Sequence, residues 1–124
     1  MSIRTFRIDV GIYNYSFIVC IGDRKKSIEF INETQELKNS DVYPINELLD
    51  YNGGVFTKDG KPTILWLPYI PKTPSDFSDL FHEIFHVVCR ILKRVEIPLT
   101  ESTEEAYCYL IGWITKQFWL EIKK

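Results

Sequence analysis

The sequence has 124 residues, of which 45% are apolar and 15% aromatic, and its net charge is −2. A chain of this size and composition forms one domain, residues 1–124, with a real hydrophobic core. The near-neutral charge argues against nucleic-acid binding. No apolar run approaches the roughly 20 residues of a membrane-spanning helix, so we expect neither nucleic acid nor membrane as a partner.

The three cysteines predict a reducing environment. Cys20, Cys89 and Cys108 form neither a Cys-x-x-Cys pair nor an even set for disulfides. We interpret Cys89 and Cys108 as buried apolar thiols rather than metal ligands. The first residues alternate charged and apolar side chains and lack the hydrophobic region of a signal peptide. The expected location is therefore the cytoplasm.

The N-terminal third predicts a hairpin followed by helical segments. Apolar residues at every second position across Ile3 to Ile21 predict two β-strands, with a turn near Asn14. The charged segment from Arg24 to Asn39 carries one thin apolar edge, which is compatible with a helix. Pro44 to Tyr51 has the pattern of a short helix, and Asn52-Gly53-Gly54 ends it.

Two further strands are predicted in the middle of the chain. Gly54–Thr57 and Pro62–Leu67 contain β-branched and aromatic residues. Between them, Asp59-Gly60 is a strong hairpin turn signal. Together with the first hairpin, these strands predict an N-terminal sheet of antiparallel or mixed type.

The stretch from Asp76 to Val95 carries the main functional signal, which is the motif H-E-x-x-H at His82-Glu83-Ile84-Phe85-His86. An apolar stripe at helical spacing predicts the helix that this motif requires. Positions four apart lie one above the other, so both imidazoles leave the helix on one face. Two neutral imidazoles can share one Zn²⁺ at about 2.0–2.1 Å. Glu83 would then lie beside the open position of the metal, where it can accept a proton from a bound water.

The helix has a clear predicted start, because Thr73 is a capping residue, Pro74 suits the first helical position and Asp76 lies in the first turn. The alternative interpretation of the motif is a helix whose histidines are surface residues or hydrogen-bonded core residues. Asp79, one turn before the motif, is interpreted as a solvated helix charge.

A catalytic zinc site uses three protein ligands and a water, so a third ligand is needed. A second helix is predicted from Ser102 to Ile122, with Glu104 and Glu105 near its start. Eighteen residues, positions 87 to 104, separate His86 from Glu105, which gives H-E-x-x-H-x18-E. Two alternatives stay open for these acids: they favour the positive end of the helix dipole, and Ser102 with Glu105 forms a capping box.

These motifs resemble those of the gluzincin metallopeptidases, in which the third ligand is a Glu on the next helix. The x18 spacing is typical of the aminopeptidase branch, and Glu105-Ala106-Tyr107-Cys108 is similar to its E-G-F-A motif. The run E-A-Y-x-Y-L also resembles small zincin-like proteins of tailed phages. The resemblance covers about residues 62–115. It implies a small α+β, zincin-like domain: a sheet, then the active-site helix, then the ligand helix.

The resemblance also implies an activity, a zinc-dependent peptidase. Zn²⁺ would be held by His82, His86 and Glu105, with Glu104 as the fallback ligand, and Glu83 would act as general base. Many gluzincins carry an Asp four residues after the ligand Glu, where this chain has Tyr109. Its phenol could accept a hydrogen bond from a ligand histidine or stabilise the oxyanion. Tyr107 is the alternative for that role, and aromatic packing is the other interpretation of both tyrosines.

The expected partner is a peptide or protein substrate. By resemblance and order in the chain, Thr63–Leu67 is predicted to be the edge strand that pairs with an extended peptide, and Pro68 suits an edge strand. Trp66 and Tyr69 would then line a subsite, although core packing is an equal alternative for Trp66.

Two other functions stay open on sequence grounds. The chain could be a zinc-binding phage virion or assembly protein with little catalysis, in which the metal joins two helices and the partners are phage structural proteins. It would then reside in the host cytoplasm or in the virion. A metal-free interaction domain is the remaining alternative.

Overall fold

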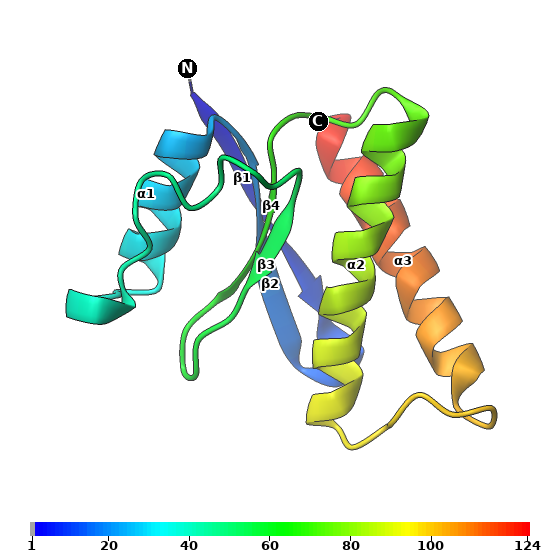
Figure 1. Ribbon diagram of the computed structural model, residues 1–124. Coiled ribbons are helices and arrows are strands. Elements are labelled where there is room, and N and C mark those ends of the chain that lie inside the picture. The colour runs from blue at the N-terminus through cyan, green and yellow to red at the C-terminus, as the bar shows by residue number, and fades with distance from the viewer. Residues whose placement is uncertain (1) are drawn as a thin grey trace.

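The first half of the chain builds a sheet, and two long helices from the second half pack against it (Figure 1). The computed structural model describes residues 2–124, and within them the strands form one four-stranded sheet in the order β1-β2-β4-β3. The sheet is mixed, so the predicted α+β arrangement of a sheet followed by two helices is confirmed. The strands are β1 (Ile3–Val10), β2 (Tyr15–Gly22), β3 (Gly54–Phe56) and β4 (Thr63–Leu67).

Both predicted hairpins are present. β1 and β2 pair antiparallel across a short 3₁₀ turn, η1 (Gly11–Tyr13), in which Asn14 takes the left-handed conformation at φ 50°. β3 and β4 pair antiparallel around the Asp59-Gly60 turn, where Gly60 has φ +75°. The two hairpins join through parallel pairing of β2 with β4.

The prediction that Thr63–Leu67 is an edge strand is wrong. This strand, β4, lies between β2 and β3, and all five of its residues are buried. Its continuous apolar sequence is the reason, because a strand covered on both faces needs no alternation with polar residues. Pro68 follows the strand instead of lying at an edge. The free edge on this side of the sheet belongs to β3.

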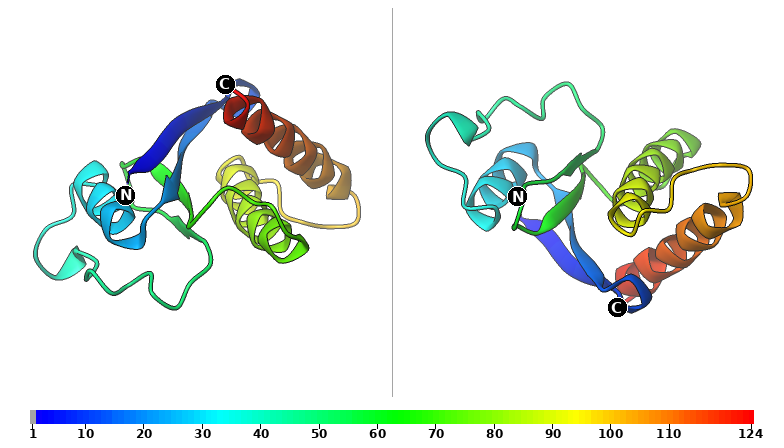
Figure 2. Two further views of the ribbon diagram at one scale, coloured as in Figure 1. Left: turned by 90° about the horizontal axis from the view of Figure 1, so that it is seen from above. Right: turned by 90° about the horizontal axis from the view of Figure 1, so that it is seen from below.

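Helices cover both faces of the sheet (Figure 2). Helix α1 (Arg24–Thr34) lies on one face, and helices α2 (Pro74–Arg94) and α3 (Glu104–Ile122) lie on the other. Alternate residues of the central strands divide between two cores, since Leu65 packs toward α2 and α3 whereas Trp66 packs toward α1.

The predicted short helix at Pro44–Tyr51 is not formed. This part of the chain is a series of turns, with Glu47 N donating to Pro44 O at 2.9 Å and Tyr51 N donating to Leu48 O at 3.2 Å. Leu48 is its one fully buried apolar residue. A single apolar anchor gives no stripe to hold a helix against the core.

The helix α2 begins as predicted. The Thr73 hydroxyl accepts a hydrogen bond from Asp76 N at 3.1 Å, and the Asp76 carboxylate accepts one from Thr73 N at 3.1 Å, which forms a capping box. Helix α3 begins at Glu104, two residues later than predicted. Its N-cap residue is Thr103, which makes no side-chain cap bond to the helix. The alternative capping box between Ser102 and Glu105 is therefore not the arrangement found.

The two long helices pack side by side along much of their length. Phe77 near the start of α2 contacts Trp119 near the end of α3, with ring centroids 5.7 Å apart. Phe85 faces Tyr107 near the start of α3 at 6.5 Å. The helices are therefore antiparallel. Within residues 2–124, no helix combines the length and apolar character needed to cross a membrane.

Candidate metal centre

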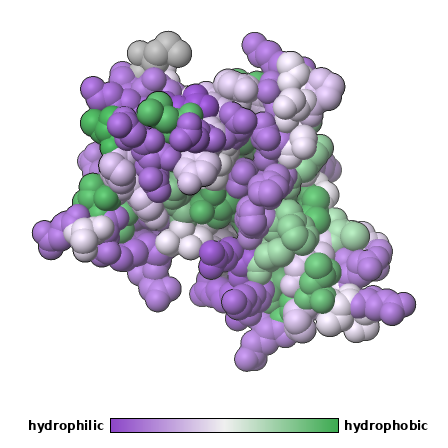
Figure 3. All heavy atoms as spheres, viewed as in Figure 1, coloured by the Kyte–Doolittle hydropathy of each residue, from purple (hydrophilic) through white to green (hydrophobic). Residues whose placement is uncertain are grey.

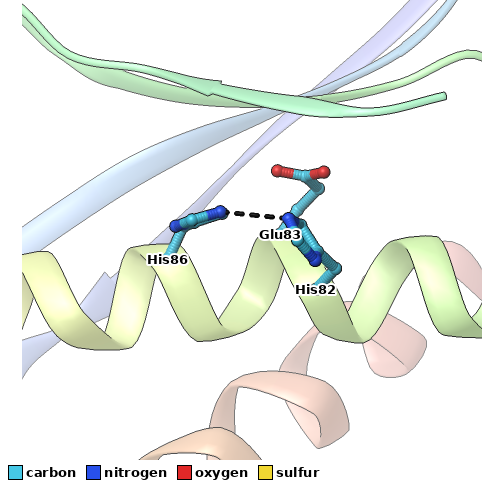
Figure 4. A group of neighbouring side chains, drawn as sticks. All are labelled: His82, Glu83 and His86. Atoms are coloured by element: carbon cyan, nitrogen blue, oxygen red, sulfur yellow. Dashed lines mark hydrogen bonds between the residues drawn. The ribbon is translucent and has the colours of Figure 1, made fainter. Parts of the chain in front are cut away.

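Helix α2 has a buried face against the core and an exposed face that carries the two histidines. Its apolar stripe, which includes Leu80 and Ile84, is fully buried against the sheet. His82 and His86 leave the helix on another side, and both are exposed to solvent. Figure 4 shows the two imidazoles on one face of α2 with Glu83 directed toward the neighbouring strands. The prediction that both imidazoles leave the helix on one face is thus confirmed.

The geometry of the cluster fits one metal ion. The Nε2 atoms of His82 and His86 lie 3.1 Å apart. Two nitrogens bound tetrahedrally to one Zn²⁺ at about 2.0–2.1 Å would be about 3.3 Å apart. A Glu83 carboxylate oxygen completes a group of three donor atoms that all lie within 4.8 Å of one another. The residues present therefore could hold a metal ion, and imidazole with carboxylate is a donor set that suits zinc.

Glu83 is the buried member of the cluster, only 8% exposed. The backbone of Gly53, just before β3, packs directly against it. A Cβ at this glycine would lie 3.0 Å from Glu83 Cγ and 3.1 Å from its Oε2. Burial raises the pKa of the Glu83 carboxyl; His82 opposes this rise and Asp79 adds to it. A carboxyl with a raised pKa exchanges protons more readily near neutral pH.

A hollow of about 320 Å³ opens beside His82 and Glu83. One wall is α2, including Ser78 and Asp79, and the other is the loop 50–53 that leads into β3. The role of this loop was not predicted from the sequence. The run Asn52-Gly53-Gly54 marks the loop, but we interpreted it only as the end of a helix. Asp79, interpreted as a solvated charge, lines the same hollow.

The surroundings of His86 favour its neutral imidazole, which is the form that binds a cation. Partial burial, the neighbouring His82 and the positive charge of Arg90 all lower the pKa of its imidazole. Only a neutral imidazole offers a nitrogen lone pair to a metal. His86 therefore stays available as a ligand at a lower pH than an isolated histidine.

The predicted third ligand lies outside the cluster. Among residues 2–124, the donor group contains neither Glu105 nor Glu104. Glu105 is exposed and instead lines a shallow hollow on α3 that also includes Lys116. His82 lines the hollow formed with the loop before β3, whereas Glu105 lines a separate hollow on α3. The assignment of Glu105 as a ligand stays a prediction that the arrangement of the helices does not support.

Neither of the two tyrosines proposed to stabilise the oxyanion lines the hollow beside His82 and Glu83. Tyr107 is buried, and its hydroxyl donates a 2.7 Å hydrogen bond to Ile97 O in the loop between α2 and α3. Its ring packs on Phe85, so its contacts are structural. Tyr109 is 75% exposed on α3 and lines a hollow with η1 rather than the one beside His82.

The remaining side chains considered from sequence also lie away from the cluster. Trp66 is fully buried and donates a 3.3 Å hydrogen bond to Gly22 O, so it packs in the core and lines no subsite. Tyr69 is 51% exposed and lines a hollow beside Arg24. The cysteines are free thiols: Cys20 is buried and Cys89 is half-buried. Cys108 is exposed, which corrects its interpretation as a buried thiol.

Comparison with known proteins returned no match: no protein-family model fits the sequence, no curated protein matches it and no solved structure matches the fold. The candidate metal site is therefore defined by the His82, Glu83 and His86 side chains alone.

Proposed function

We propose that this protein binds a zinc ion through His82 and His86 and hydrolyses peptide bonds with Glu83 as general base. The observation that supports the proposal most strongly is the cluster itself: two imidazole nitrogens 3.1 Å apart, with a Glu83 carboxylate oxygen within 4.8 Å of both, beside an open hollow. A structural or surface pair of histidines would not need a buried carboxylate next to it.

A bound zinc ion would supply a Lewis acid and lower the pKa of its water toward neutrality. Glu83 would take the proton from the attacking water and return it to the leaving amine. Its raised pKa favours both transfers, because the carboxyl can hold a proton between them. The Gly53 backbone lies so close to the Glu83 side chain that an added Cβ would come within 3.0 Å of Glu83 Cγ, and this proximity supports a defined position for the base.

The free edge of the sheet is the proposed place for a peptide substrate. β3 lies at that edge, and the loop that leads into it forms one wall of the hollow. An extended peptide could pair with main-chain groups of β3 and pass the cluster, although Phe56 O already accepts a 3.0 Å hydrogen bond from Gln35 Nε2. This assigns to β3 the role that sequence analysis gave to Thr63–Leu67.

Two measurements test the proposal. Metal analysis of the purified chain should give one zinc per chain, lost in His86→Ala. A peptide-library digest should show cleavage by wild type and a loss of about 10²–10⁴-fold in Glu83→Gln, with zinc retained. Equal cleavage by Glu83→Gln would remove Glu83 from the mechanism, and a metal-free wild type would remove the whole site.

A second candidate function is zinc binding without catalysis, and the same two measurements test it. The observation that favours it is the absence of a carboxylate from α3 in the donor cluster of residues 2–124. A two-histidine site closed by Glu83 would bind metal but leave no free base. Zinc binding with no cleavage of any library peptide by wild type would select this alternative.

A further inference from the structure

Helix α3 is apolar on more sides than its packing in this chain requires. Four of its residues are buried against the sheet and α2: Tyr107, Leu110, Ile114 and Phe118. The opposite side nevertheless carries Tyr109 and Trp113, which are 75% and 40% exposed. Helices that are apolar all round are usually covered on more than one face.

The exposed side forms one continuous stripe. Positions 105, 108, 109, 112, 113 and 116 follow helical spacing and are all exposed. The same six residues line one shallow hollow on the surface of α3. We call them the α3 stripe: Glu105, Cys108, Tyr109, Gly112, Trp113 and Lys116. Its two ends are eleven residue steps apart, which corresponds to about 16 Å of helix.

The α3 stripe is complementary to itself in the antiparallel direction. Its acid, Glu105, and its base, Lys116, stand at opposite ends, at equal distances from the point midway between Leu110 and Ile111. A two-fold axis through that point would bring each Glu105 to the Lys116 of a second copy. A surface that meets itself in this way is what a two-fold homodimer requires.

The same symmetry pairs large residues with small ones. Tyr109 would face Gly112 of the second copy, where the surface is open because a Cβ at Gly112 would meet nothing within 4 Å. Trp113 would face Cys108 of the second copy, and sulfur packs well against aromatic rings. Three kinds of pairing thus share one register: charge with charge, Tyr with Gly, and Trp with Cys.

We propose that a second copy of this chain docks on the α3 stripe, with the two α3 helices antiparallel. The apolar surface continues beyond the stripe, since Tyr109 and Trp113 also line a hollow of about 450 Å³ against η1. Ile12, 87% exposed on η1, stands at this hollow and extends the contact. Figure 3 shows that apolar side chains gather over the α2 and α3 side of the molecule, whereas the α1 side is mostly hydrophilic.

The dimer is expected to be a weak one. One helix pair with flanking η1 residues buries less than the roughly 800 Å² per partner of a standard interface. A dissociation constant in the micromolar range, about 10⁻⁶–10⁻⁴ M, is therefore expected. Sedimentation velocity of the full chain over that range should show a reversible monomer–dimer equilibrium.

Charge reversal tests the register directly. Glu105→Lys and Lys116→Glu each place like charges together twice in the homodimer, so each alone should weaken association by about tenfold. An equimolar mixture of the two variants restores both attractive pairs and should recover the wild-type dissociation constant, as should the double variant. Glu104→Lys is the matched control, because Glu104 is exposed in the same turn but lies outside the α3 stripe.

The outcomes separate this proposal from the others. Monomer at all concentrations, or single variants that associate like wild type, would overturn it, as would a mixture that fails to recover association. Zinc content measured on the same samples tests the earlier prediction for Glu105. If Glu105→Lys loses zinc while it associates normally, Glu105 is a metal ligand and the docking proposal fails. Zinc retained with association lost supports docking.

Discussion

The two long helices carry opposite kinds of free surface. α2 buries one apolar stripe and presents the histidines of the candidate metal site on another face. α3 buries a similar stripe, yet its outward face carries exposed Tyr109 and Trp113. Both helices pack against the same core, so packing does not explain the difference. The difference lies in what the two free faces carry: candidate metal donors on α2, and apolar side chains flanked by Glu105 and Lys116 on α3.

The largest expected effect comes from the buried side of α2. Ile84, inside the H-E-x-x-H motif but fully buried, faces the core. Ile84→Ala should lower the free energy of unfolding by about 2–5 kcal/mol, measured by urea denaturation. Trp113→Ala on the α3 stripe is the control and should change the free energy of unfolding of the monomer by only about 0.5 kcal/mol. Equal losses would mean that the outward face of α3 is part of the fold's core.

A smaller loss of stability is expected at Gly53, where the loop before β3 contacts Glu83. In Gly53→Ala, the new methyl group would press on Glu83 Cγ and Oε2. We expect a loss of about 1–3 kcal/mol in the free energy of unfolding, together with weaker peptide cleavage. Gly11→Ala is a suitable control because its Cβ would meet nothing within 4 Å. If Gly53→Ala behaves like Gly11→Ala, the loop does not position Glu83.

Tyr107→Phe tests whether this tyrosine has a structural role. The variant removes the hydrogen bond to Ile97 O and keeps the ring against Phe85. A loss of about 1 kcal/mol is expected in thermal or urea unfolding, with unchanged zinc content and unchanged cleavage. A large fall in cleavage rate at unchanged stability would instead return Tyr107 to the oxyanion role.

The smallest effect is the pH dependence of Glu83. Burial raises its pKa in the fold above its ordinary value of 4.5, so the folded state favours the protonated carboxyl. The metal-free chain should therefore lose stability from this group as pH rises through the folded pKa. Glu83→Gln should match wild type below pH 4.5 and exceed it at neutral pH by less than about 1 kcal/mol, because solvent still reaches the site. A neutral-pH loss of stability in Glu83→Gln would contradict this sign.

Much of the fold could be predicted because the local signals were strong. The alternating residues of β1 and β2, the Asp59-Gly60 turn and the Thr73 cap each specify an element through local chemistry. The position of β4 in the sheet could not be read in this way. Its central position in the sheet depends on pairing with β2, more than 40 residues earlier in the chain. The local sequence of a strand does not indicate which distant strand it pairs with.

The candidate site was predictable only where its residues share one helix. The spacing of His82, Glu83 and His86 fixes their common location once α2 forms. The prediction for Glu105 relied on spacing along the chain, but the direction of its side chain depends on the rotation of α3 about its own axis. That rotation is set by the buried stripe through Tyr107 and Leu110, which turns Glu105 outward. The loop at Gly53 was missed because its contact with Glu83 is tertiary.

The central claim is that the cluster on α2 binds a metal, and calorimetric titration of the metal-free chain with Zn²⁺ tests it most directly. The account predicts one ion per chain, with binding lost in His82→Ala and in His86→Ala and kept in Glu105→Lys. Binding that survives in both histidine variants, or no binding by wild type, would contradict it.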